Sequence, residues 1–235
     1  MLCFGNKLNM NLREFFAKAE RRGRKNLTEY ESQKILQHYQ IPVAETYLAK
    51  TVQQAVVMAE NIGYPVVLKV SSPAVIHKTE VGGYVLNIHN RGEVETAFRK
   101  IMNNVRRHTN KIDGILVQKM ESGLEVMVGS KKDAQFGNVL VFGLGGVMVE
   151  AIGDVAMRVL PITKTEVEEM IAETKAYKIL SGGRGRKYDI DTLIKIILRL
   201  AKMLKENSEI NEIDLNPVIV SSEGAVAADA RIILQ

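Results

Sequence analysis

The sequence has little cysteine, no tryptophan and no long apolar run. Its one cysteine, Cys3, stands near the start of the 235 residues, so we expect neither a disulfide framework nor a zinc site built on cysteines. No run of about 18 apolar residues is present, which predicts that no helix crosses a membrane. The first residues lack a long apolar segment followed by small residues, which argues against a secretory signal and favours the cytoplasm.

The charge and the aromatic content of the chain indicate which kinds of binding partner to expect. The net charge is +5, and the densest basic run, Lys18 to Lys25, is typical of a solvated helix face. Aromatic residues make up 6% of the chain and do not alternate with basic ones, so a nucleic-acid partner is not expected. Anionic small molecules fit the charge, and an apolar content of 46% predicts a packed core.

Helix and strand patterns alternate along the chain and predict an α/β (α+β) fold. We expect a boundary near residue 113, which gives an N-terminal extension and helix (1–27), an α/β lobe (28–113) and an antiparallel sheet with helices (114–235). The predicted helices cover 11–22, 28–41, 51–62, the region around 94–105, 163–180 and 189–205. The predicted strands cover 43–50, 65–70, 84–88, 114–120, 124–131, 138–146, 154–161 and a C-terminal hairpin of "EIDLNPVIV" with "AVAADARIIL".

The stretch "VVLKVSSPAVIHKTEVGGYV" (66–85) joins an apolar strand to a loop that closes on paired glycines. Lys69 inside the strand either extends its ammonium group to solvent at a sheet edge or holds an anion such as phosphate. None of the four histidines has a second histidine or a cysteine at metal-ligand spacing, which argues against a metal role for His77. His77 is therefore either a turn residue or a nucleophile or base, and an imidazole can accept a phosphoryl group.

A second group of polar residues lies in "LVQKMESGLEV". Gln118, Lys119 and Met120 end one strand, and Glu125 stands early in the next. Such groups can bind the edge of an adenine and the hydroxyls of a ribose, although an ordinary hairpin would carry the same residues on its outer face.

Two further groups lie towards the C-terminus. Arg158, behind the glycine cluster of "FGLGGVMVE", is either an outward strand arginine or a phosphate ligand. Asp214 and Asn216 share one face of a strand because they are two residues apart, and Asp229 is expected on the partner strand. These oxygens would suit Mg²⁺.

Taken together, "GYPVVLKVSSPAVIHKTEVGG", "FGLGGVMVEAIGDVAMRVLP" and "EIDLNPVIV" resemble the nucleotide site of the ATP-grasp family over residues 28–234. The closer resemblance is to the β subunits of ADP-forming acetate–CoA ligases, which are relatives of the nucleotide-binding subunit of succinyl-CoA synthetase. It implies two subdomains with the nucleotide between them. The implied reaction converts acyl-CoA, ADP and phosphate into the free acid, CoA and ATP.

The resemblance also implies roles for single residues and a partner. His77 would carry the phosphoryl group, Lys69 and Arg158 would hold phosphates, and Glu125 would bind ribose. Gln118 with the backbone of Lys119 and Met120 would face adenine, and the Mg²⁺ ligands would be Asn216, Asp229 and, with less direct support, Asp214. An α subunit with the CoA-binding and acyl-phosphate-forming domains would complete a heterotetramer. The family loop commonly has Ser-Asp where this chain has Thr79-Glu80, which keeps a hydroxyl and a carboxylate.

Two other functions remain open on the sequence. One is a standalone ATP-grasp ligase that activates a carboxylate as an acyl phosphate, with His77 only structural. The other is a nucleotide-sensing module without catalysis.

Overall fold

The structure is a computed structural model that describes residues 11–75, 77–145, 153–182 and 187–235. The chain divides into two compact units. The small unit contains residues 28–30 and 43–122, and the large unit contains residues 31–42, 123–235 and the described part of 1–27. Within the described residues, no helix is both long and apolar enough to span a bilayer.

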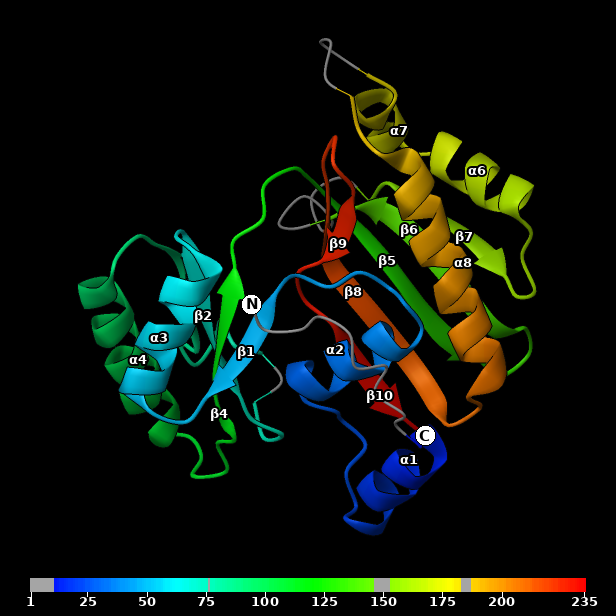
Figure 1. The fold of residues 1–235 in the computed structure, drawn as a ribbon. Helices are drawn as coiled ribbons and strands as arrows, with labels where there is room; N and C mark the ends of the chain where they lie inside the picture. The colour runs from blue at the N-terminus through cyan, green and yellow to red at the C-terminus, as the bar shows by residue number, and fades with distance from the viewer. Residues whose placement is uncertain (1–10, 76, 146–152, 183–186) are drawn as a thin grey trace. The chain divides into compact units, whose positions relative to one another are not determined.

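The small unit is a four-stranded antiparallel sheet with two helices. The sheet order is β1-β4-β2-β3, so β2 is an internal strand, paired on one side with β4 and on the other with β3. Helices α3 and α4 pack against each other and against strands of this sheet, as Figure 1 shows. The side chains of Thr51 and Asn90 cap the two helices by accepting hydrogen bonds from the N–H groups of Gln54 and Glu93. The elements are β1 (Thr46–Ala49), α3 (Val52–Ile62), β2 (Val66–Ser71), β3 (Tyr84–Ile88), α4 (Arg91–Arg106) and β4 (Gly114–Lys119).

The large unit is built on a six-stranded antiparallel sheet. Its strand order is β10-β8-β5-β6-β7, and β9 also pairs with β8. Helices α6, α7 and α8 cover one face of the sheet (Figure 1). The strands are β5 (Leu124–Asp133), β6 (Gly137–Leu144), β7 (Val155–Val159), β8 (Ile210–Val220), β9 (Ala225–Ala227) and β10 (Arg231–Leu234). The helices are α1 (Leu12–Arg21), α2 (Glu29–His38), α6 (Lys164–Ala172), α7 (Lys175–Leu180) and α8 (Ile190–Glu206), and α2 has its first residues in the small unit.

Strand alternation separates the two faces of the large sheet. Val126 and Val128 of β5 and Leu140 and Phe142 of β6 are fully buried and form the core with the helices. The residues that alternate with them along the strand, such as Glu125, point to the opposite face because successive side chains of a strand alternate. The helix-covered face therefore carries the core, and the opposite face is the one on which polar side chains of β5 and β8 gather.

Two predicted elements are interrupted in the structure. The helix predicted over 163–180 is divided into α6 and α7, because both the N–H and the hydroxyl of Thr174 bond to the carbonyl of Ile171 and end the first helix. The C-terminal strand predicted through 225–234 is also divided, into β9 and β10. Asp229 lies in the interruption between them, so its predicted place on a strand is wrong.

The observed division of the chain also differs from the predicted boundary near residue 113. β4 lies in the small unit because it pairs with both β1 and β2, and the chain passes to the large unit between Ser122 and Gly123. Most of α2 belongs to the large unit rather than to the lobe predicted over 28–113.

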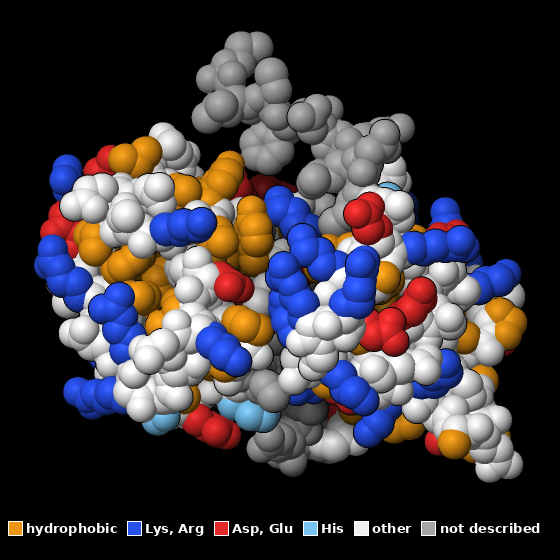
Figure 2. Space-filling view, turned by 90° about the horizontal axis from the view of Figure 1, so that it is seen from below, with side chains coloured by type: hydrophobic (Ala, Val, Ile, Leu, Met, Phe, Trp, Pro, Cys, Tyr) orange, Lys and Arg blue, Asp and Glu red, His pale blue; other side chains and the backbone are white. Residues whose placement is uncertain are grey.

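The basic run Lys18 to Lys25 is solvated, as predicted. Lys18, Arg21 and Arg22 are exposed, whereas Arg24 forms an ion pair with Glu31. The face in Figure 2, seen from the side on which α1 lies in Figure 1, carries basic side chains with acidic ones among them. The exposed side chains of this run agree with an ordinary solvated helix face.

Candidate functional site

Lys69 lies in the middle of β2 and is held by a buried carboxylate. Its Nζ is 2.9 Å from Oε1 of Glu29, the first residue of α2. The Nζ of Lys78 is 2.9 Å from the other oxygen, Oε2, of the same carboxylate. The side chains of Lys69, Lys78 and Glu29 are 10%, 18% and 1% exposed. Lys69 therefore does not reach solvent at a sheet edge, and its burial is offset by an opposite charge.

The loop that carries His77 is fixed at both ends, and His77 itself is exposed. On the side of β2, the hydroxyl of Ser72 donates to the carbonyl of Lys111 at 2.5 Å. On the side of β3, the N–H of Gly83 donates to the carbonyl of Lys78 at 2.7 Å. A Cβ atom on Gly83 would lie 2.9 Å from a methyl group of Val70, so this close approach requires glycine.

The residues predicted to face adenine lie at the end of β4. Gln118 is buried, and its Nε2 donates to the hydroxyl of Thr46 at 3.0 Å. The N–H of Lys119 donates to the carbonyl of Glu45 at 2.8 Å, and the N–H of Met120 donates to that of Pro65 at 3.2 Å. Both backbone amides therefore already donate within the small unit.

Glu125, Asp214 and Asn216 lie on the same face of the large sheet. Glu125 is exposed near the start of β5, and the two others are partly buried on β8. The register pairs Glu125 with Ile219 and Gly129 with Asp214, which sets the positions of these side chains along neighbouring strands.

Asp214 has an acidic environment. Burial raises the pKa of its carboxyl, the nearby Arg231 guanidinium lowers it, and the negative charges of Asp229 and Glu212 raise it further. The Nη2 of Arg231 is 4.0 Å from Asp214 Oδ2 but only 2.7 Å from Glu212 Oε1, so Arg231 binds Glu212 more closely. Burial near like charges makes an ionised Asp214 costly unless a cation is close.

These residues fit a magnesium ion. The carboxylates of Asp214 and Asp229 and the amide of Asn216 are hard oxygen donors, and Mg²⁺ takes few such protein ligands beside water and phosphate oxygens. No group of three or more His, Cys, Asp or Glu side chains within the described ranges is arranged to hold a metal. The predicted set has only two carboxylates, and it would depend on the amide and on phosphate oxygens to complete the coordination.

Arg158 is not brought together with the other predicted residues of the large unit. It lies on β7 opposite Leu140, on the helix-covered face, and its guanidinium binds both oxygens of the Glu173 carboxylate, at 2.5 and 3.1 Å. This bond raises the pKa of Arg158 and lowers that of Glu173. A nucleotide phosphate would have to displace Glu173 to bind Arg158.

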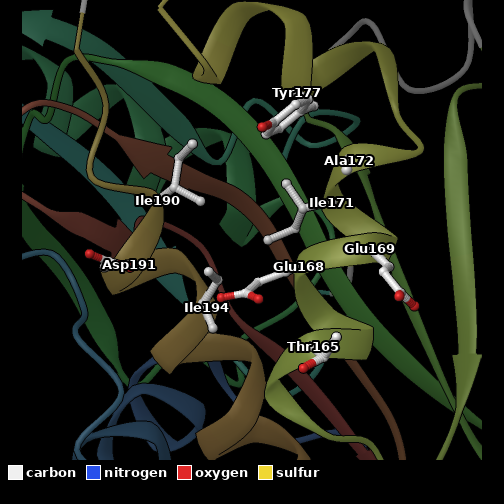
Figure 3. A pocket seen from close by; sticks show the side chains of 9 residues that line it. All are labelled: Thr165, Glu168, Glu169, Ile171, Ala172, Tyr177, Ile190, Asp191 and Ile194. Carbon is white, nitrogen blue, oxygen red and sulfur yellow. The ribbon is translucent and has the colours of Figure 1, made fainter.

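The helices of the large unit also form a hollow of about 460 Å³, shown in Figure 3. Its lining combines apolar side chains with the carboxylates of Glu168, Glu169 and Asp191, and the carboxylate of Glu168 points towards Ile194. None of the predicted site residues lines it, so it is separate from the candidate nucleotide site. The lining residues are Thr165, Glu168, Glu169, Ile171, Ala172, Tyr177, Ile190, Asp191 and Ile194.

One residue of this arrangement was not predicted from the sequence. Glu29 lies 40 residues before Lys69 in the sequence. Because Glu31 is also acidic and lies close by, no sequence pattern distinguishes Glu29 as the partner of the lysine. The signal was indirect: a lysine in an apolar strand requires a buried acid, but the sequence does not say which one.

The comparison with known families gives one decisive match. Residues 18–234 match the ATP-grasp domain family. The chain belongs to the ATP-grasp family. The α+β ATP-grasp fold expected from the resemblance is therefore confirmed.

Within the ATP-grasp family, the chain belongs with the β subunits of ADP-forming acetate–CoA ligases. It is 45% identical over 226 residues to the β subunit of acetate–CoA ligase [ADP-forming] I of Pyrococcus furiosus, covering 94% of this chain and 97% of that one. Acetate–CoA ligase [ADP-forming] I of Archaeoglobus fulgidus is 47% identical over 85% of this chain, which spans only 30% of that longer protein.

Solved ATP-grasp structures agree with this placement. A dinucleotide-forming acetyl-coenzyme A synthetase 1 of Ca. Korarchaeum cryptofilum, in complex with coenzyme A and Ca-AMPCP, matches with a TM-score of 0.89 and 44% identity over 95% of this chain and 99% of that one. Another structure of that enzyme holds Mg-AMPPCP, and its phosphohistidine segment points towards the nucleotide-binding site; its TM-score is 0.83 at 41% identity, with 95% and 99% of the two chains covered.

Proposed function

We propose that this ATP-grasp chain is the nucleotide-binding subunit of an ADP-forming acyl-CoA synthetase. It transfers a phosphoryl group from phosphorylated His77 to ADP, within the overall conversion of acyl-CoA, ADP and phosphate into acid, CoA and ATP. The observation that carries the proposal is an exposed His77 on a loop fixed at both ends, followed at once by a lysine that shares a carboxylate with Lys69. An imidazole in this position can meet a phosphate while a buried ammonium group lies close behind the loop.

Each of the other predicted residues binds a different part of the nucleotide. Lys69 holds its phosphates, Glu125 accepts hydrogen bonds from the ribose, and the end of β4 receives the adenine through Gln118, Lys119 and Met120. Asn216, Asp229 and Asp214 would hold Mg²⁺, which when bound neutralises charge on the phosphates. The role predicted for Arg158 is kept as a proposal in which a phosphate replaces Glu173. The catalytic contribution of this chain is then positioning and charge neutralisation rather than acid–base chemistry.

The chain is proposed to act with a partner. Its relatives from Pyrococcus furiosus are named as β subunits, and the Archaeoglobus fulgidus relative is a longer chain of which this one spans 30%. The remaining part of that protein is large enough for the domains that bind CoA and form the acyl phosphate. We infer an α subunit with those domains and a heterotetrameric assembly. A standalone ligase would need neither the α subunit nor the heterotetramer.

The experiment that tests the proposal is phosphorylation of the chain by ATP. The chain is incubated with γ-labelled ATP and Mg²⁺. An imidazole nitrogen of His77 attacks the γ-phosphorus, the bond to the β,γ-bridging oxygen breaks, and ADP leaves. We expect a label on the protein that is stable in alkali and lost in acid. The label should be absent from His77→Asn and present in His89→Asn, which changes another exposed histidine of the small unit.

Two results would contradict the proposal. Equal labelling of His77→Asn and of the unchanged chain would exclude His77 as the phosphoryl carrier and favour the standalone ligase. Absence of ATP synthesis from acyl-CoA, ADP and phosphate by the chain mixed with its α partner would favour a sensing module.

A further inference from the structure

The carboxylate of Glu29 joins two lysines that lie on either side of His77 in the sequence. Oε1 binds Lys69, on the strand that leads into the loop, and Oε2 binds Lys78, the residue after His77. Both distances are 2.9 Å, and the Glu29 side chain is 1% exposed, so water screens these ion pairs little. One buried carboxylate thus connects the strand that leads into the loop with the residue that follows His77.

Lys78 is fixed at both its backbone and its side chain. Its carbonyl accepts from the N–H of Gly83 at 2.7 Å, and the carbonyl of Gly83 in turn accepts from the N–H of Val70 on β2 at 2.7 Å. The side chain of Lys78 ends at Glu29. Because His77 directly precedes Lys78, the direction of its backbone depends on both attachments.

We infer that Glu29 is a positioning residue for His77. The inference rests on the proposed function, in which His77 carries the phosphoryl group, and it adds a residue that touches neither nucleotide nor phosphate. Without the Glu29 carboxylate, the ammonium groups of Lys69 and Lys78 would be two like charges in a buried space, and their repulsion would drive them apart. Lysine is flexible enough for Lys78 to turn away, and the loop end would move with it.

The binding site for nucleotide phosphates is linked to the loop through the same carboxylate. Lys69 is the residue proposed to hold phosphates, and it shares Glu29 with Lys78. A phosphate that draws Lys69 away from Oε1 leaves Glu29 bound to Lys78, so the attachment of the loop survives nucleotide binding. Glu29 therefore still holds Lys78, the residue after His77, while Lys69 exchanges partners.

The test combines three variants with two measurements. Glu29→Gln keeps the size of the side chain and removes its charge, Lys78→Met removes only the loop attachment, and the double variant removes both. Glu60→Gln and Lys100→Met change exposed residues of α3 and α4 as controls. The first measurement is the single-turnover rate of phosphorylation by γ-labelled ATP. The second is hydrogen exchange of the amides in residues 77–83, which does not require any phosphoryl transfer.

We expect phosphorylation about 100-fold slower in Glu29→Gln and in Lys78→Met, because a displacement of about 1 Å costs this much in a positioned reaction. The affinity of Lys78→Met for ATP should stay within about threefold, which separates positioning from binding. The double variant should be no slower than Glu29→Gln, since the two residues act through one contact. The amides of residues 77–83 should exchange faster in all three variants, and their exchange rates should be unchanged in the two controls.

Glu29→Asp supplies a variant that keeps the charge with a shorter side chain, and it should recover part of the rate lost in Glu29→Gln. If Glu29→Gln does not fold, Lys78→Met still decides the inference, because it leaves the Glu29–Lys69 pair in place. Unchanged exchange and an unchanged rate in Lys78→Met would overturn the inference, as would a double variant whose loss is the product of the single losses. An unchanged chain that takes no label would instead overturn the proposed function, while hydrogen exchange would still test the attachment of the loop.

Discussion

Replacing Lys69 by methionine should weaken both the fold and the binding of nucleotide. Methionine fills a similar volume but has no ammonium group, so the 2.9 Å ion pair with Glu29 is lost. Breaking a buried pair costs about 3–5 kcal/mol when the remaining charge is left alone, and a hydrogen bond to a charged group is worth about 1.5–3 kcal/mol. Since Glu29 keeps its ion pair with Lys78, we expect the lower value, about 2 kcal/mol.

This loss of stability should lower the melting temperature by about 4–8 °C, given about 2–4 °C per kcal/mol for a chain of this size. If Lys69 also holds a phosphate, losing that contact should raise the dissociation constant of ADP by about 10- to 150-fold, the equivalent of about 1.5–3 kcal/mol.

Thermal unfolding and isothermal titration with ADP and Mg²⁺ measure the two effects, with Lys100→Met as the exposed control. A dissociation constant within about threefold of that of the unchanged chain would refute the phosphate role of Lys69. A melting temperature no lower than that of the control would refute the energetic role of the pair.

Three further perturbations have defined outcomes. Asp229→Asn should make nucleotide binding less dependent on Mg²⁺ in a titration of affinity against metal, and an unchanged dependence would exclude this ligand. Asp189→Ala should destabilise the chain by about 1 kcal/mol in urea unfolding at pH 7, because Asp189 caps α8 by accepting from the N–H and hydroxyl of Thr192. These bonds lower the pKa of Asp189. Its contribution to the free energy of unfolding is therefore present above the ordinary pKa of an aspartate and is lost as the pH falls through the lowered pKa. A loss of stability in Asp189→Ala that is as large under strongly acidic conditions as at pH 7 would contradict this. Gly83→Ala should destabilise the chain by about 1–3 kcal/mol, since the added methyl group would lie 3.1 Å from the carbonyl of Lys78, and a melting temperature equal to that of the unchanged chain would contradict it.

The strand and loop around His77 could be predicted because their signals are local. An apolar run specifies β2, and the paired glycines mark the point where the loop must return closely to that strand. What the stretch does not contain is its ionic partner: Glu29 is far away in the sequence and was found only through the tertiary structure.

Two features of the large unit do not follow from the sequence, and the reasons are related. Alternation along β7 separates its two faces but does not say which face the helices cover, so the ion pair of Arg158 with Glu173 was not foreseen. The apolar pattern around Asp229 continues through its strand break, because Ala228 and Ala230 preserve the hydrophobic run while the chain changes its pairing on β8. In both cases the sequence specifies the periodicity, and the packing of distant elements decides the outcome.

The proposed function requires that His77 passes its phosphoryl group to ADP. Its most direct measurement uses the chain labelled by γ-labelled ATP, freed of nucleotide and mixed rapidly with ADP and Mg²⁺. We expect the label to leave the protein and to appear in ATP in equal amount, and we expect His77→Asn to carry no label to transfer. Label that remains on the protein in the presence of ADP, or that is released only as inorganic phosphate, would contradict it.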